Sequence, residues 1–143
     1  MSGYGLNKEF HLSTVLEKNL KNQGFDVKII NASVSGDTTT GGLNRLNWLL
    51  ENTEIDIVIL CLGANDMLRG TNPDLIKQNL NKILERLRKR NIKVLLAGML
   101  SQGTYGKKYK KNFDKIYPEL AKKHKVTFIP FLLKGVALKP SYN

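Results

Sequence analysis

Residues 55–66, with the sequence IDIVILCLGAND, join the strongest strand pattern of the chain to a glycine, an amide and an acid. The run 55–62 is apolar on both faces of an extended chain, which is typical of a central strand in a parallel sheet. Asn and Asp are frequent in turns because both tolerate left-handed and bridging backbone conformations. A turn alone could therefore account for Asn65 or Asp66. We expect instead that the side-chain NH2 of Asn65 points into a reaction site.

Helical and extended patterns alternate on both sides of this strand. Apolar residues recur at helical spacing in four segments, 7–24, 38–52, 73–90 and 108–124. Short apolar or β-branched runs predict strands at 25–30, 55–62, 92–99 and 126–131. This α-β-α-β-α-β-α-β order predicts an α/β fold, with a parallel sheet covered by helices, in a single domain over residues 1–143.

Local signals mark several of these helix ends. Gly24 is a natural C-cap, Asn72 and Pro73 form an N-cap with a first-turn proline, and Pro118 predicts a kink or a break. The residues expected to face a core are Leu12, Val15, Leu16, Leu20, Leu43, Leu46, Leu49, Leu50, Ile76, Leu80, Ile83, Leu84, Leu87, Phe113, Ile116, Tyr117 and Leu120.

The bulk composition limits the classes of site. The chain has 143 residues, enough for one domain with a real core, and 41% of them are hydrophobic. The single cysteine, Cys61, excludes an intrachain disulfide, and without spaced Cys or His partners it argues against structural zinc. His11 and His124 lie far apart in helical patterns, so we expect each to be a satisfied or exposed histidine rather than a metal ligand. No apolar run has the length of a membrane span, so we expect no stable membrane anchor.

A formal net charge of +11 raises the question of nucleic-acid binding. The basic clusters at 85–91 and 105–115 fall on or beside amphipathic helices, where lysines form the natural solvent face. Neither cluster has a helix-turn-helix, zinc-binding or RNP-like pattern. We therefore expect no nucleic-acid partner.

Ligands of open parallel sheets bind at the carboxyl ends of the strands, which places the chemistry in the loops after residues 30, 62, 99 and 131. In the loop after residue 30, Gly36 lets the backbone approach a ligand and donate its N–H, and Asp37 or Thr38 can cap the next helix. A plain strand-to-helix turn would also account for Gly36 and Asp37. With the Asn65 amide, the Gly36 N–H would supply two of three hydrogen-bond donors to an oxyanion.

In these two loops the sequence resembles the SGNH, or GDSL, hydrolase family, within it the bacterial arylesterase and thioesterase I/lysophospholipase group. NASVSGDTTTGGLNRL (31–46) is similar to the second sequence block of that group and LGANDMLRG (62–70) to the third. YGKKYKKNFDKIYPELAKKHKV (105–126) and FIPFLLKGVALKP (128–140) are similar to later segments. The resemblance covers residues 2–143.

The resemblance implies a flavodoxin-like three-layer α/β/α fold with strand order 2-1-3-4-5, in which the first strand and the last helix are missing here. It implies a bacterial ester or thioester hydrolase with an acyl-serine intermediate, and Gly36 and Asn65 as oxyanion-hole residues. The implied substrates are aryl esters, short or medium acyl esters, acyl-CoA and lysophospholipids, which indicates a role in lipid metabolism. The resemblance implies no metal and no cofactor. Tyr105 and Gly106 could line the acyl pocket, or they could form a plain turn.

The sequence also departs from the family pattern. The nucleophilic serine of the family lies in a Gly-Asp-Ser-Leu block, and residues 2–5 (SGYG) resemble the stretch after that block. The Asp-x-x-His block of the family follows a segment like residues 137–140, and His11 and His124 match no catalytic position. We therefore expect the serine, aspartate and histidine to lie outside this chain and the chain alone to be inactive. The alternative is a non-catalytic ligand-binding protein on a decayed hydrolase scaffold. A periplasmic or a cytoplasmic location fits equally, and the oligomeric state is not indicated.

Overall fold

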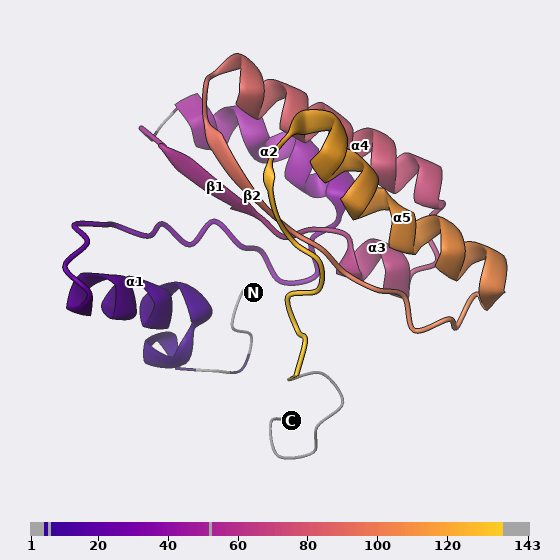
Figure 1. Cartoon of the computed structure of the whole chain (residues 1–143), viewed down its shortest axis with the longest axis horizontal. Coiled ribbons are helices and arrows are strands. Elements are labelled where there is room, and N and C mark those ends of the chain that lie inside the picture. Colours follow the sequence, from indigo (N-terminus) through magenta and orange to yellow (C-terminus); the bar gives the residue numbers. More distant parts are fainter. Residues whose placement is uncertain (1–4, 6, 52, 136–143) are drawn as a thin grey trace. The chain divides into compact units, whose positions relative to one another are not determined.

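The computed structural model describes residues 5, 7–51 and 53–135. It divides into two compact units, Met1–Asp37 and Thr38–Asn143 (Figure 1). The second unit contains the sheet and every residue that is buried among those described.

The described residues of the first unit form a short 3-10 helix, Lys8–Phe10, the helix α1, Leu12–Asn22, and a tail without regular secondary structure. The predicted stop at Gly24 is confirmed. Gly24 has a φ of +88°, and the N–H groups of Gly24 and Phe25 donate to the carbonyls of Lys21 (3.0 Å) and Leu20 (3.1 Å). A glycine in the left-handed region thus closes the helix.

Two expectations for this unit are wrong. Residues 25–30 form no strand. A strand shares its backbone hydrogen bonds with a neighbouring strand, and the described residues of this unit include none. The N–H of Ile29 donates instead to a carboxylate oxygen of Glu17, 2.6 Å away. No residue of α1 is buried, and Leu12 and Val15 of its apolar stripe are 46% and 40% exposed. Without a sheet in its own unit, the stripe has no apolar face to cover.

Among its described residues, the second unit has a parallel sheet of three strands in the order β1-β2-β3. The strands are β1, Ile57–Leu60, β2, Lys93–Ala97, and β3, Thr127–Ile129. Its helices are α2, Thr39–Glu51, α3, Ala64–Leu68, α4, Pro73–Lys89, and α5, Gly106–His124. The order confirms the predicted succession of the last three strands, but β1 lies at an edge of this sheet rather than in the centre.

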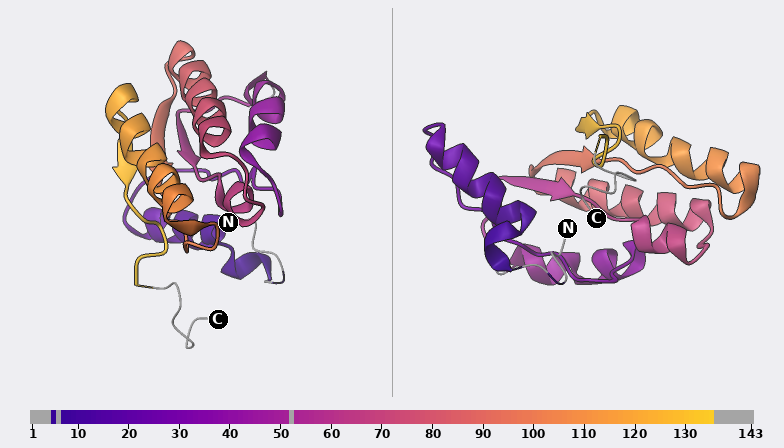
Figure 2. Two further views of the ribbon diagram at one scale, coloured as in Figure 1. Left: turned by 90° about the vertical axis from the view of Figure 1, so that its right-hand side faces the viewer. Right: turned by 90° about the horizontal axis from the view of Figure 1, so that it is seen from below.

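The helices α2, α4 and α5 lie side by side over one face of the sheet (Figure 2). The helix α4 connects β1 to β2 and α5 connects β2 to β3, and crossovers of the same hand between successive neighbours place both helices on the same face. The helix α2 precedes β1 and packs against α4.

The core lies between this helix layer and the sheet. The predicted apolar faces of α4 and α5 are confirmed: each of the following side chains is at most 1% exposed, namely Ile76, Leu80, Ile83, Leu84, Leu87, Phe113, Ile116, Tyr117 and Leu120. In α2 the residues Leu43, Leu46 and Leu50 are buried, and Leu49 is half-buried. Burying one such side chain stabilises the fold by about 1.5–3 kcal/mol.

The start of α4 is as predicted, with Pro73 first and the Asn72 side chain accepting a hydrogen bond of 2.9 Å from the N–H of Asp74. The predicted break at Pro118 does not occur, since α5 runs through it to His124. The neighbours Ile116, Tyr117 and Leu120 are fully buried, and this packing holds the helix together around the missing N–H.

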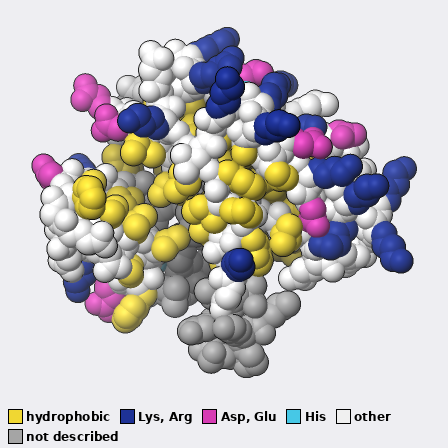
Figure 3. Space-filling view, in the orientation of Figure 1, with side chains coloured by type: hydrophobic (Ala, Val, Ile, Leu, Met, Phe, Trp, Pro, Cys, Tyr) yellow, Lys and Arg dark blue, Asp and Glu magenta, His cyan; other side chains and the backbone are white. Residues whose placement is uncertain are grey.

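The sheet face opposite the helices is partly open. Ile57 and Ile59 of β1 are 59% and 38% exposed, whereas Leu60, which faces the helices, is 6% exposed. Hydrophobic side chains gather over the strands in the space-filling view (Figure 3). The apolar pattern of β1 predicted burial on both faces. Within this unit, helices cover only the face to which Leu60 belongs.

Candidate active site

Asn65 lies just beyond the carboxyl end of β1, in the first turn of α3. A loop was expected here, but the N–H of Met67 donates to the carbonyl of Gly63 at 2.9 Å, and that of Arg69 to the carbonyl of Asn65 at 3.1 Å. These bonds make a short helix, which gives Asn65 a fixed backbone. The residue is half-buried, as a donor that must reach both protein and ligand should be.

The next residue, Asp66, is the most buried acid of the described chain, at 1% exposure. One carboxylate oxygen accepts the N–H of Thr39 at 2.9 Å, and the other accepts the Thr39 hydroxyl at 2.6 Å. A carboxylate at a helix N-terminus is favoured by the unsatisfied N–H groups and by the helix dipole. Asp66 therefore ties α3 to the first turn of α2.

The side chain of Asn79 on α4 completes this buried polar group. Its NH2 donates to the hydroxyl oxygens of Thr39 at 3.2 Å and Thr40 at 2.9 Å. Asn79 is 6% exposed and Thr39 is fully buried. Because the main polar groups of the network have partners, the network can hold the segment beside Asn65 rigidly.

The other side of α3 faces aromatic residues of α5. The hydroxyl of Tyr117 donates to the carbonyl of Leu62 at 2.8 Å. Gly63 has a φ of +115°, and a Cβ there would collide with the Tyr117 hydroxyl. Both the backbone conformation and the close approach therefore require glycine at this position.

Tyr105, a predicted pocket residue, lies beside the same segment. Its hydroxyl donates to the carbonyl of Leu68 at 2.9 Å, and it lines a small pocket of about 70 Å³ with Met67, Leu68, Ser101 and others. The second predicted pocket residue, Gly106, is the first residue of α5. It has a φ of +85°, and its N–H donates to the carbonyl of Gly103 at 2.9 Å.

Gly36 belongs to the other unit of the structure. Its φ of +75° favours glycine, and it lies in a turn in which the N–H of Asp37 donates to the carbonyl of Val34 at 3.3 Å. A turn therefore accounts for the backbone conformation of Gly36. The contribution of the Gly36 N–H to an oxyanion site stays a prediction.

A larger hollow of about 690 Å³ lies in the first unit, but none of the predicted site residues lines it. Its walls include Lys8, His11, Glu17 and Lys21. An open, lysine-rich surface without a buried polar anchor offers little to orient a substrate.

The environment of the site affects two groups that could otherwise react. Burial, and then the nearby Asp66 carboxylate, raise the pKa of Tyr109, and burial raises the pKa of Cys61. A thiol with a raised pKa is a poor nucleophile at neutral pH. Cys61 therefore does not replace a serine.

His124 lies away from these residues, at the end of α5. Its Nε2 is 2.8 Å from the side-chain oxygen of Asn81, and burial and then Lys123 lower its pKa. In the described ranges, no three His, Cys, Asp or Glu side chains are grouped so as to hold a metal ion. Over the same residues, no helix combines the length and the apolar character needed to cross a membrane.

Sequence reasoning missed the residues that support Asn65. Asp66 was treated only as a turn former, and its position directly after Asn65 was the available signal. The four-residue spacing of Tyr105, Tyr109 and Phe113 also indicated one face of a helix, but nothing in it showed which backbone the hydroxyl groups would meet.

Known proteins resemble most of the chain. Residues 1–142 match the GDSL-like Lipase/Acylhydrolase family. The chain is similar to the esterase TesA of Pseudomonas aeruginosa, with 39% identity over 132 residues, which are 92% of this chain and 66% of that protein. It is also similar to the thioesterase 1/protease 1/lysophospholipase L1 of Escherichia coli K12, with 40% identity over 114 residues, which are 80% of this chain and 55% of that protein.

Among solved structures, AlinE4, an SGNH-hydrolase family esterase, matches with 43% identity and a TM-score of 0.95, over 99% of this chain and 76% of that one. This similarity confirms the predicted α/β fold class. The chain spans about two thirds of the length of the Pseudomonas aeruginosa protein and about half that of the Escherichia coli protein.

Proposed function

Because the chain belongs to the GDSL-like lipase/acylhydrolase family, we propose that it serves the hydrolysis of esters or thioesters through an acyl-serine intermediate. Its relatives are named as an esterase and as a thioesterase and lysophospholipase, which supports serine ester hydrolysis of small acyl substrates. Aryl esters, short or medium acyl esters and acyl thioesters are the substrate classes to test first.

The observation that carries the proposal is the placement of Asn65. Its carboxamide follows the carboxyl end of β1, where parallel sheets bind ligands, on a helix that Asp66 ties to α2. When a nucleophile attacks the acyl carbon, the carbonyl oxygen becomes an oxyanion. A fixed NH2 donor stabilises that charge without reorganising, and the Gly36 N–H would be a second donor.

The nucleophilic serine, the histidine that takes its proton and the aspartate that orients the histidine would come from segments outside residues 1–143. Tyr105, beside Met67 and Leu68 in the small pocket, would contact the acyl chain. Gly106 would shape the start of α5 next to it.

The test uses this chain joined to a Gly-Asp-Ser-Leu block before it and an Asp-x-x-His block after it, with p-nitrophenyl butyrate as substrate. Asn65→Ala should lower kcat about 10²–10³-fold, as expected for the loss of one oxyanion donor. Asn65→Asp keeps the shape and the turn propensity but has no NH2, so it should be equally slow. Asn44→Ala, at an exposed position on α2, is the matched control.

Full kcat in Asn65→Ala or Asn65→Asp would show that Asn65 is a turn residue and would refute its role as an oxyanion donor. The 143-residue chain by itself should not hydrolyse the ester above background. Turnover that survives further purification would instead place the nucleophile within residues 1–143. A chain that binds acyl ligands but stays inactive after both blocks are joined would favour the non-catalytic binding protein.

A further inference from the structure

Three tyrosine hydroxyls of the α5 region donate to backbone carbonyls of one short segment, residues 62–71. Tyr117 donates to Leu62 at 2.8 Å, as described above. Tyr105 donates to Leu68 at 2.9 Å. Tyr109 donates to Thr71 at 2.9 Å. The segment contains α3, so these bonds bracket Asn65 on both sides.

The rings that carry these hydroxyls form one continuous row along α5. Ring centroids are 5.3 Å apart for Tyr105 and Tyr109, 6.2 Å for Tyr109 and Phe113, and 5.7 Å for Phe113 and Tyr117. A four-residue spacing puts all four rings on one helix face. Phe113 is fully buried and is the one ring of the row without a hydroxyl.

Two glycines of the segment fit the row closely. A Cβ on Gly63 would collide with the Tyr117 hydroxyl, and a Cβ on Gly70 would lie 2.8 Å from the Tyr105 ring. Both glycines also have positive φ values, +115° and +66°. The backbone of the segment therefore lies directly against the tyrosine rings, with no side chain between them.

We propose that Tyr105, Tyr109 and Tyr117 are positioning residues that hold residues 62–71 so that the Asn65 carboxamide is aimed at the oxyanion. This inference rests on the proposed function of Asn65. Asp66 fixes α3 on the side of α2, and the tyrosine hydroxyls fix the backbone before and after it on the side of α5. A donor whose segment is fixed at both ends needs little reorganisation when the oxyanion forms.

Tyr→Phe substitution tests the hydroxyl while keeping the ring. In the chain joined to the two added blocks of the test above, Tyr109→Phe and Tyr105→Phe should each lower kcat about 3–10-fold, as expected for one hydrogen bond, with KM unchanged. The double variant should lose more. Thr14→Val, which removes a hydroxyl-to-carbonyl bond of 2.8 Å in the first unit, should leave kcat unchanged.

The decisive comparison repeats these substitutions in Asn65→Ala. If the tyrosines act through Asn65, the kcat loss caused by Tyr→Phe should vanish in that background. An equal loss with and without Asn65 would mean a general structural role and would overturn the inference. Full kcat in both Tyr→Phe variants, while Asn65→Ala is slow, would overturn it and leave the proposed function intact.

Hydrogen exchange of the 143-residue chain gives a readout independent of catalysis. Tyr109→Phe and Tyr105→Phe should speed exchange of the amides of Met67, Arg69 and Thr71, and leave the amides of α4 unchanged. Unchanged exchange at these three amides would contradict the inference, whatever the activity of Asn65→Ala. Tyr117→Phe is the more disruptive variant because its ring is part of the core, so the inference is judged on Tyr105 and Tyr109.

Discussion

The contacts of Asp66 give it a structural role. It lies on α3, and its carboxylate accepts hydrogen bonds from the N–H and the hydroxyl of Thr39, the first residue of α2. A buried carboxylate with two short hydrogen bonds is costly to remove, because its former partners are left without an acceptor. The support of Asn65 thus depends on a side chain that never needs to touch a substrate.

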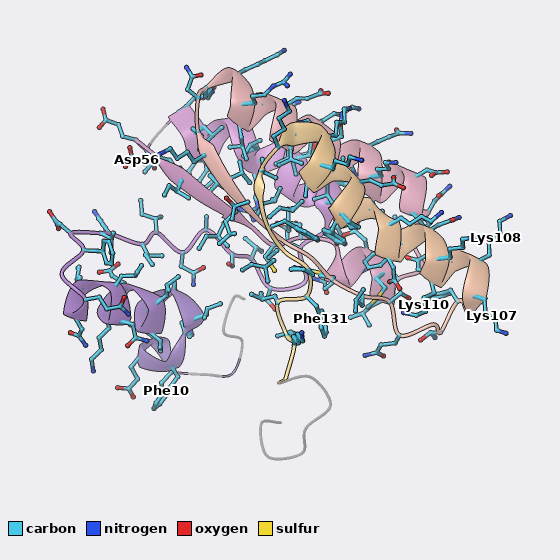
Figure 4. The ribbon with its side chains drawn as sticks, in the orientation of Figure 1. Phe10, Asp56, Lys107, Lys108, Lys110 and Phe131 are labelled. Atoms are coloured by element: carbon cyan, nitrogen blue, oxygen red, sulfur yellow. The ribbon has the colours of Figure 1, made fainter. Side chains whose placement is uncertain are left out.

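Asp66→Ala should lower the free energy of unfolding by about 1–3 kcal/mol, since the Thr39 N–H would be buried without a partner. Urea unfolding followed by circular dichroism measures the change. Asp56→Ala, at an exposed position before β1, is the control and should stay within about 0.5 kcal/mol of the parent chain (Figure 4). Equal effects of the two substitutions would contradict the assignment.

His124 makes stability depend on pH in a defined direction. Its folded-state pKa lies below the ordinary histidine value of 6.5, because burial, Lys123 and Arg88 disfavour the imidazolium. The unfolded chain therefore binds a proton more readily, and stability should fall as the pH drops below about 6.5 towards the folded pKa.

The measurement is urea unfolding of the parent chain and of His124→Gln between pH 7.5 and 5. Stability should fall less steeply between pH 7.5 and 5 in His124→Gln than in the parent chain. A steeper acid decline in His124→Gln than in the parent would show that the sign is wrong.

At the scale of elements, the same amphipathic pattern has two outcomes. The stripe of α4 is buried against the sheet and two helices, whereas no residue of the α1 stripe is buried. The difference lies in what each helix has to pack on, because an apolar face is stabilised only by a partner surface.

The open edge and face of β1 should promote association between chains. Ile59→Lys is expected to reduce aggregation with little change in melting temperature, because Ile59 is 38% exposed and the lysine can reach water. Leu60→Lys, one residue further on the same strand but facing the core, should unfold the domain. Light scattering and thermal melting of both variants at equal concentration test this, and a destabilised Ile59→Lys would mean that this face is covered in solution.

At the scale of the whole molecule, charge and burial are unevenly distributed. The net charge of +11 is carried largely by lysines and arginines along the outer surfaces of α4 and α5 (Figure 3), and Lys107 and Lys108 stand at the first turn of α5 (Figure 4). Within α5, Lys110 is held by the carbonyl of Ser101 at 2.6 Å and by Asp114 at 2.8 Å. This pattern is that of a solvated helix face, and the absence of a nucleic-acid partner stays a prediction.

The two units should differ in local stability. Before Thr39 no described residue is buried, while α4 alone has five core side chains that are at most 1% exposed. Amide exchange of α1 should therefore be at least about 10²-fold faster than that of α4 in the 143-residue chain. Mass spectrometry of the two helices measures this, and equal protection would show that the units unfold together.

The sequence by itself determined what depends on local pattern and neighbours along the chain. The helices α2, α4 and α5, the caps at Gly24 and Asn72, the three parallel strands and their succession all follow from periodicity, turn chemistry and the short connections that a βαβ unit allows.

The tertiary structure decided what depends on partners distant in sequence. Residues 25–30 have the composition of a strand but form none in the described part of the chain, and β1 has the composition of a central strand but lies at an edge of the described sheet. The links from Asp66 to Thr39 and from Tyr109 to Thr71 span 27 and 38 residues of chain. No local pattern encodes such a pairing, because Asp and Tyr also occur in turns and on solvent-exposed helix faces. Only the folded chain brings the partner of each side chain within hydrogen-bond distance.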